Sequence, residues 1–504
     1  MTSLTKAAVW VFIINIASKI FGLLKESIIA YKFGTSYIVD AYTIAIAFPS
    51  IIFAIFAGGL MESFVPVITR IDENANKNKF VNNVIIIMSI MSIIMTVLCI
   101  VFSDRIVDIL APGFSGECRE LSESFISLIS LMLLPMVLFS ILAGYLNSKE
   151  KFIIVNVCNF IVANIVIIIS IIVATYNHPN ILIFGHIFSY IIPLIIVWIY
   201  AERRTFFRFV FFIDIRSKYI KELLQLAIPL GLSLIVNQIN AMISRAIAST
   251  LGTGVVSALN YADKVQLIFY SLVASVMISV CFPRINKCFA KDDYSTGMKY
   301  IAKGFMVATL IGIPAAVVLF FFAEPITNLI FERGSFDSNS TYITAGCLAF
   351  YAIGIPFYSY REILLRGLSA SKKQKLILKN TVIAIGFNIL LCFAFVGPLK
   401  HIGVALATSI SGIIASALMY YDLHKLKLKL FNSIMLIDIL KICICTVFMV
   451  IAGMVIYNFL EQMINETLAL IASAILMMAL YGLGIIIFKV NIFRWMLNSI
   501  LKNR

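Results

Sequence analysis

Charged residues are scarce in this sequence, because Asp, Glu, Lys and Arg together make up only 13% of its 504 residues. Apolar residues make up 61% of the chain, and there are only four histidines and three tryptophans. So little polar material cannot cover the water-facing surface of a protein of this length. The composition therefore excludes a soluble globular protein.

Several chemical motifs are also missing from the sequence. There is no GxxxxGK[ST] stretch for cradling nucleotide phosphates, so we do not expect ATP hydrolysis by this chain. The histidines have no HExxH or other metal-ligand spacing, and the paired acids at 72–73 and 292–293 are typical of solvated turns. The nine cysteines give no disulfide framework. We therefore expect no cofactor, no metal site and no enzymatic activity.

Long apolar segments recur from one end of the chain to the other. About 20 apolar residues in a helix cross the roughly 30 Å hydrocarbon core of a bilayer. The predicted fold is therefore an all-α polytopic membrane protein with about fourteen transmembrane helices. The predicted segments are 6–33, 36–66, 81–103, 121–147, 153–175, 180–200, 221–250, 255–284, 299–322, 341–367, 376–397, 401–422, 437–459 and 466–489.

Basic residues are concentrated in alternate loops between these segments. One side of the membrane receives Arg70, Lys149, Arg203, Arg284 and Lys373 together with their basic neighbours, and the other side receives few. Because cytoplasmic loops of membrane proteins are enriched in Lys and Arg, both termini are expected in the cytoplasm. The net charge of +15 has the same origin, so nucleic acid is not an expected partner.

The sequence also repeats itself. Residues Phe33–Tyr42 align with Leu251–Asn260 at a shift of 218, and Asn147–Asn156 align with Ser371–Asn380 at a shift of 224. Matches in the same order at a nearly constant shift predict two repeats of six helices. Because six is even, the repeats keep one orientation and should be related by an axis along the membrane normal, with a central cavity between them.

The repeat predicts three parts of the chain. Residues 1–205 would form an N-lobe with helices 1–6, and residues 206–425 a C-lobe with helices 7–12. Residues 426–504 would add two further helices. The basic and aromatic stretch 201–224 is expected to lie on the inner leaflet as an amphipathic connector, and a plain charged loop is the alternative.

Ionisable residues inside the predicted spans are the candidate binding residues. They are Lys19, Lys25, Glu26, Asp40, Arg245, Asp263, Lys264 and Arg361. Lipid cannot solvate such groups, so they are expected to face the bundle interior or a wet cavity. With Glu362 and Arg366 they number six cations and four anions, and a surplus of two positive charges suits an anion such as a pyrophosphate.

Structural explanations compete with this interpretation. Lys25–Glu26 and Asp263–Lys264 are each candidates for a structural ion pair. Lys32 is expected to extend to the outer membrane surface. Hydrogen bonds between helices are expected for four asparagines, Asn156, Asn164, Asn380 and Asn388.

Six short stretches resemble one known family. They are SKIFGLLKE (Ser18–Glu26), FGTSYIVDAYTIAIAFP (Phe33–Pro49), FVPV (Phe64–Val67), LNYADKV (Leu259–Val265), FERGSF (Phe331–Phe336) and GVALATS (Gly403–Ser409). In this order they resemble the lipid II flippases of the MurJ (MviN) type. That family belongs to the superfamily of multidrug (MATE), oligosaccharidyl-lipid and polysaccharide exporters.

The resemblance implies a transporter of two six-helix lobes in a bacterial inner membrane, which faces the cytoplasm and the outside in turn. It would move the undecaprenyl-pyrophosphate-linked peptidoglycan precursor, with cell-wall synthesis enzymes as possible partners and the last two helices as a groove for the lipid tail. The basic cavity residues that the family requires would be Lys19, Lys25 and Lys264, with Asp40 as their acidic partner.

This chain departs from the family at those positions. The family usually has arginine where Lys19, Lys25 and Lys264 stand, and lysine lacks the guanidinium fork that binds phosphate through two hydrogen bonds. Another lipid-linked oligosaccharide, of the exopolysaccharide or teichoic type, therefore remains an alternative cargo. A multidrug or cation antiporter is a further alternative, although an exporter of cations would favour an acidic cavity. A scaffold for cell-wall assembly would not need Lys19 or Lys264.

Overall fold

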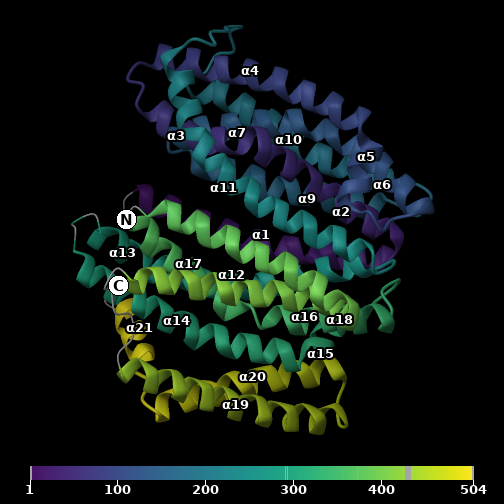
Figure 1. Ribbon diagram of the computed structural model, residues 1–504, viewed down its shortest axis with the longest axis vertical. Helices are drawn as coiled ribbons and strands as arrows, with labels where there is room; N and C mark the ends of the chain where they lie inside the picture. The colour runs from purple at the N-terminus through teal and green to yellow at the C-terminus, as the bar shows by residue number, and fades with distance from the viewer. Residues whose placement is uncertain (1–2, 290, 292, 372, 426–432, 502–504) are drawn as a thin grey trace. The chain divides into compact units, whose positions relative to one another are not determined.

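The computed structural model describes residues 3–289, 291, 293–371, 373–425 and 433–501. Its secondary structure is helical throughout the described ranges, which contain no strand and one isolated bridge between Thr175 and His178. Figure 1 gives the helix labels used below. The predicted all-α fold is confirmed.

The elements up to residue 204 form the first repeat. They are α1 (Ser3–Phe33), α2 (Tyr37–Phe53), the π-helix η1 (Ala54–Gly58), α3 (Gly59–Thr69), α4 (Asn74–Val101), α5 (Ser103–Leu110), α6 (Gly116–Ile129), η2 (Ser130–Met132), α7 (Leu133–Ser148), α8 (Phe152–Asn156), the π-helix η3 (Val157–Val162), α9 (Ala163–Val173) and α10 (Asn180–Arg204). Proline cannot donate a helical hydrogen bond, and η1 begins five residues after Pro49.

The second repeat and the added helices follow. They are α11 (Lys218–Ser249), α12 (Val255–Val280), α13 (Phe282–Phe289), α14 (Tyr294–Phe321), α15 (Ala323–Phe331), α16 (Ser338–Ala352), α17 (Ile355–Ala370), α18 (Gln374–Lys425), α19 (Ser433–Glu461), α20 (Glu466–Ile487) and α21 (Asn491–Leu501). The long α18 changes direction at Lys400, whose φ is +49°, and so joins two of the predicted segments.

The two repeats match helix by helix. Both α4 and α14 contain 28 residues, and their first residues, 74 and 294, are 220 apart. Both α7 and α17 contain 16 residues, and their first residues, 133 and 355, are 222 apart. Gly34 and Gly252, 218 apart, each have a positive φ, +58° and +112°, in the turn before an inward helix. The predicted repeat is confirmed at the level of the helices.

The fourteen predicted segments all fall on helices, and length and composition alone mark a smaller number of helices as candidate membrane spans. Nine helices in the described part of the chain are long and apolar enough to cross a membrane, or up to eleven if two bent pairs each form one span. Neither α1 nor α11 is among them. The protein is therefore a polytopic membrane protein, and the number fourteen stays a prediction.

The described residues group into two compact units. The first unit contains residues 1–257 with 333–336, and the second contains 258–332 with 337–504. This grouping places α11 with the first repeat, because α11 packs closely against α3 at Gly59 and Gly231. The lobe boundaries at 205 and 425 describe the repeat rather than the packing, and they stay a prediction.

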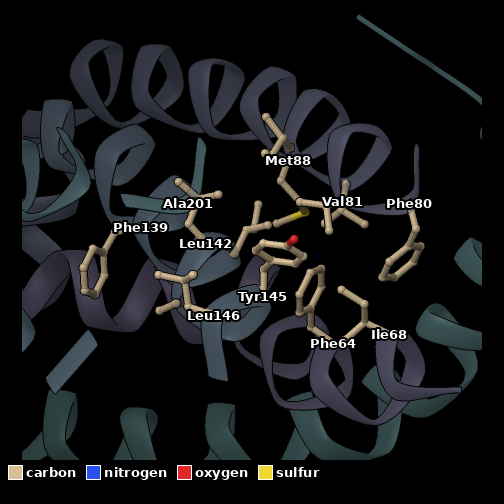
Figure 2. Packing of buried hydrophobic residues seen from close by; sticks show 14 of the residues in the cluster. Phe64, Ile68, Phe80, Val81, Met88, Phe139, Leu142, Tyr145, Leu146 and Ala201 are labelled. Carbon is tan, nitrogen blue, oxygen red and sulfur yellow. The ribbon is translucent and has the colours of Figure 1, made fainter. Parts of the chain in front are cut away.

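The core of the first unit lies where α3, α4, α7 and α10 pack together. Figure 2 shows Phe64, Ile68, Phe80, Val81 and Tyr145 converging there from three of these helices. The rings of Phe64 and Phe80 stack with their centroids 5.4 Å apart. Both α3 and α4 pack on α7 here, so close apolar packing joins these helices in one cluster.

The core of the second unit includes the helices added after the repeat. α19 and α20 lie side by side (Figure 1) and pack on α14 through Phe322, Met449, Tyr457 and Met477. The Tyr481 hydroxyl of α20 donates to the carbonyl of Leu310 on α14 at 2.6 Å. The added helices are therefore bound to the second repeat.

The connector between α10 and α11 has no regular secondary structure at residues 207–214. Side-chain amides of α4 hold it, because Asn82 donates to the carbonyl of Arg208 at 2.8 Å and Asn83 donates to that of Asp214 at 2.7 Å. The predicted position on the inner leaflet stays a prediction.

The four asparagines divide into two pairs. Asn380 donates to Asp422 at 2.8 Å and Asn388 donates to Thr408 at 3.5 Å, so both cross between the two arms of α18 as predicted. For the other two the prediction is wrong. Asn156 donates to Phe152 at 2.8 Å and Asn164 donates to Phe160, each within its own helical stretch, because the carbonyl four residues earlier lies within reach.

Candidate functional site

Three candidate residues lie along α1 in the first unit. The Lys19 side chain is exposed. The Lys25 ammonium lies 3.3 Å from the Glu26 carboxylate, and the two side chains are 14% and 2% exposed. A carboxylate so deeply buried needs a positive partner, so the structural ion pair predicted as an alternative does form. Lys25 keeps a partly open face, and the pair as a whole has no net charge.

Asp40 is completely buried and acts on the backbone of a distant segment. Its carboxylate accepts the N–H groups of Gly254 at 2.5 Å and Ser257 at 2.8 Å, which lie at the N-terminus of α12. A helix N-terminus leaves such donors unsatisfied, and an acidic side chain is a favoured partner for them. Asp40 therefore caps the start of α12, and its pairing with a lysine stays a prediction.

Arg245 lies on α11 and is half-buried. One turn and a half earlier on the same helix, the side-chain oxygen of Asn240 is buried with no hydrogen-bond partner among the described residues. An unsatisfied buried amide oxygen is costly unless water or a ligand reaches it. This part of α11 thus contains both a cation, Arg245, and a buried hydrogen-bond acceptor without a described partner, the side-chain oxygen of Asn240.

The candidate residues of the second unit lie on α12 and α17. Asp263 is exposed and Lys264 is half-buried, and the ion pairs formed by the described residues do not include one between them. The alternative explanation as a structural ion pair therefore does not hold for Asp263–Lys264. The ammonium of Lys264 remains a candidate for an anionic ligand.

The two arginines of α17, Arg361 and Arg366, have different surroundings. Arg366 donates to Glu362 at 3.1 Å. The Nε of Arg361 is buried, and no described residue accepts its hydrogen bond. The nearby Tyr358 hydroxyl of α17 donates to the carbonyl of Thr408 at 3.1 Å.

The polar contacts of two side-chain groups, the Tyr42–His186 pair and Lys32, were not predicted from the sequence. Tyr42 and His186, both buried, are joined by a hydrogen bond of 2.6 Å across 144 residues of chain. Lys32 donates to the carbonyls of Ile171, Ile172 and Ala174 at 2.5–3.1 Å, where α9 ends, and its predicted extension to the outer membrane surface stays a prediction. A lysine is a favoured partner for a helix C-terminus. For the Tyr42–His186 contact the available sequence signal was His186 itself, since a histidine within an apolar span needs a polar partner.

Comparison with known proteins adds the family. A family model described as "Lipid II flippase MurJ" matches residues 29–490. The "Probable lipid II flippase MurJ" of Rickettsia prowazekii is 28% identical over 493 residues, which cover 96% of each chain. The "Lipid II flippase MurJ" of Burkholderia cenocepacia is 25% identical over 433 residues, which cover 82% of each chain.

Solved structures agree with the sequence comparison. A lipid II flippase MurJ in an inward closed conformation matches with a TM-score of 0.81 and 26% identity, over 97% of this chain and 100% of that one. An inward-facing multidrug resistance transporter of the MATE family matches with a TM-score of 0.70 and 16% identity, over 81% of this chain and 95% of that one, and this likeness concerns the fold alone.

The repeated helices, the apolar spans and the buried charges define a polytopic membrane transporter of the two-repeat class. The family model covers most of the chain from residue 29 to residue 490. The protein therefore belongs to the lipid II flippase MurJ family, as the resemblance of its motifs implied.

Proposed function

We propose that this chain moves lipid II, the undecaprenyl-pyrophosphate-linked peptidoglycan precursor, from the inner to the outer leaflet by alternating access. The observation that carries the proposal is the family match over residues 29–490. The protein would act in a bacterial inner membrane with both termini in the cytoplasm. It would transport its cargo without covalent chemistry and supply it to cell-wall synthesis enzymes.

The cargo presents two chemical problems, and the first is its pyrophosphate. Moving an anion into hydrocarbon without compensation is prohibitively costly. We assign the compensating charge to the cations of both repeats, Lys19, Lys25, Arg245, Lys264 and Arg361. Glu26 and Asp263 would limit their net charge, and Asp40 would act by positioning α12.

The second problem is the polyprenyl tail, which is too apolar to pass through a wet cavity. The second unit contains an apolar cavity of about 650 Å³ between α14, α15, α19 and α20. Leu310, Pro314, Met449, Met477 and Tyr481 line it. An isoprenoid chain needs surroundings as apolar as the bilayer that it leaves, so this cavity suits the tail. The last helices of the chain would then guide the lipid.

Depletion of the protein in its native bacterium tests the cargo. If the proposal holds, lipid II accumulates in the inner leaflet, as measured by extraction and mass spectrometry with a probe that reads only the outer leaflet. Accumulation of a different polyprenyl-linked saccharide, with a normal amount of lipid II, would contradict lipid II as the cargo. It would still support a transporter of lipid-linked saccharides. A lost resistance to cationic drugs with no lipid intermediate would favour the antiporter.

Variants of the proposed cations test the site. Lys19→Ala and Lys264→Ala should each abolish growth rescue in the depleted strain, because a charge that meets the pyrophosphate is lost. Lys19→Arg and Lys264→Arg should restore it, because arginine keeps the charge and adds a bidentate geometry. Lys373→Ala, in an exposed turn before α18, is the matched control and should rescue growth fully. Full rescue by both alanine variants would exclude these lysines from the site.

A further inference from the structure

A second apolar groove lies in the first unit, away from the cavity assigned to the lipid tail. It has a volume of about 480 Å³ and runs between η1, α3, α4 and α11. Ile55, Leu60, Met88, Leu224 and Ile228 are among its lining residues. Its outer rim is open, since Ile55 is 52% exposed, Leu224 46% and Ile228 65%. No described segment of the chain fills it.

One end of this groove carries positive charge. Lys221 precedes Leu224 by three residues and Ile228 by seven, so all three side chains share one face of α11. Lys218 lies one turn earlier on α11, and Arg216 directly follows Ile215, which lines the groove. All three cations are exposed. A compact cationic cluster therefore follows the groove where α11 begins.

The nearby carboxylates do not neutralise this cluster. Glu222 is bound to Arg70. Asp214 accepts the backbone N–H of Arg216 at 3.0 Å. Within the described residues, no ion pair involves Arg216, Lys218 or Lys221. Three cations against the one carboxylate of Asp214 leave two net positive charges, and the N–H groups at the start of α11 add to them.

We propose that this groove binds one anionic phospholipid, with an acyl chain against Leu224 and Ile228 and its phosphate at Arg216, Lys218 and Lys221. An apolar slot that ends in unpaired cations matches an amphiphile with an anionic head. Basic pockets between transmembrane helices recognise such headgroups. A partner protein helix would need a polar rim on both sides of the slot, whereas charge lies at one end only.

This lipid would be a resident ligand and not the cargo. Its chain would lie between α4 and α11, next to the close contact of Gly59 with Gly231. A ligand that binds only the folded protein stabilises it in proportion to the logarithm of its concentration. The lipid would thus hold α11 against the first unit, independently of what the transporter carries.

The purified full-length protein in a neutral detergent tests the proposal. Dioleoyl phosphatidylglycerol and dioleoyl phosphatidylcholine would be titrated separately, with bound lipid counted by native mass spectrometry and unfolding followed by heating. We expect one tight phosphatidylglycerol per chain and a raised melting temperature, with phosphatidylcholine bound at least ten-fold more weakly. Equal binding of the two lipids would overturn the proposal.

Two kinds of variant separate the headgroup from the groove. Arg216→Gln, Lys218→Gln and Lys221→Gln together should weaken phosphatidylglycerol binding by more than ten-fold, since each surface cation contributes roughly a factor of five. Ile228→Trp should fill the slot and displace the lipid with all charges intact. Lys373→Gln with Lys375→Gln, two exposed cations at the start of α18, are the matched control and should bind as the wild type does.

Two outcomes would contradict a lipid site specifically. If glycerol 3-phosphate displaces the lipid at an equal phosphate concentration, the cluster is a free phosphate site. If Ile228→Trp leaves binding unchanged while the charge variant weakens it, the contact is surface electrostatics without a groove. Unchanged binding by the triple glutamine variant would exclude the cluster altogether.

Discussion

Asp40 and Ser257 are 217 residues apart in the chain, and the carboxylate of the first accepts the backbone N–H of the second at 2.8 Å. Gly254 adds a second N–H at 2.5 Å, and its φ of +88° is one that residues with a side chain rarely adopt. The turn before α12 thus brings two donors to one buried carboxylate. Asp40, an acidic residue inside a predicted membrane span, here caps a helix. A charged residue within a span is therefore not by itself evidence of a ligand-binding site.

Asp40→Asn should destabilise the protein by roughly 1–3 kcal/mol, because the amide keeps only one acceptor and leaves a buried N–H without a partner. The measurement is thermal unfolding of the purified protein in detergent. Asp337→Asn is the control, since Asp337 is an exposed cap that accepts the N–H of Ser340 at 2.8 Å. Water can replace that partner, so its cost should stay below about 1 kcal/mol. Equal losses in the two variants would contradict a special role for Asp40.

Gly59→Ala should separate α3 from α11. A Cβ at this position would lie 2.2 Å from the carbonyl oxygen of Ala227 and 2.7 Å from the nitrogen of Gly231. Both contacts involve backbone atoms, which cannot move away as a flexible side chain does. We expect a loss of roughly 1–3 kcal/mol, typical of overpacking, measured as a lower melting temperature in detergent.

Gly22→Ala is the matched control on α1, where an added Cβ would meet nothing within 4 Å. Because alanine is a better helix former than glycine, this variant should gain up to about 1 kcal/mol. Opposite signs for two identical substitutions would establish that the helix crossing, and not glycine itself, matters. A gain in stability for Gly59→Ala would contradict the predicted clash between α3 and α11.

The helices and the repeat were readable from the sequence because each depends on local composition. Apolar runs of membrane length placed all fourteen segments, and the aligned turns placed Gly34 opposite Gly252. Short helices such as α5 and α15 were missed, because eight or nine residues at the end of an apolar run have no pattern of their own. The added helix α21 was missed for the same reason.

The partners of the charged residues were harder to predict than their positions. The sequence placed Asp40 within a span, but its partners are backbone N–H groups, which no residue type signals. Tyr42 and His186 lie 144 residues apart, so only the fold brings them together. Lys25 and Glu26 are sequence neighbours, and their ion pair was accordingly foreseen as one of two explanations.

Trp495→Leu should loosen α21. The indole ring has the guanidinium of Arg284 at 5.5 Å and the ammonium of Lys303 at 4.7 Å from its centroid. Cation–π contacts at partly exposed sites contribute about 0.5–1 kcal/mol each. Losing both should raise the amide hydrogen-exchange rates of α21 roughly five-fold. Arg494→Ala, an exposed neighbour on the same helix, should leave these rates unchanged. Unchanged rates in Trp495→Leu would mean that other contacts hold the helix.

Acid should loosen the first turn of α16. The hydrogen bonds that Asp337 accepts from the Ser340 hydroxyl and backbone lower the pKa of its carboxyl below the ordinary value. A carboxyl with a depressed pKa adds stability above its unfolded pKa of about 3.9, and that stability is lost as the pH falls through the folded pKa. The loss should therefore occur below about pH 4.

The amide of Ser340 reports this transition directly, because its N–H is bound to the Asp337 carboxylate. Its hydrogen-exchange protection, corrected for the intrinsic rate at each pH, should be constant between pH 7 and pH 5 and should fall towards pH 3. In Asp337→Asn the same protection should be weaker and flat over this range, since the amide does not titrate. A fall of equal size in that variant would assign the acid response to another group.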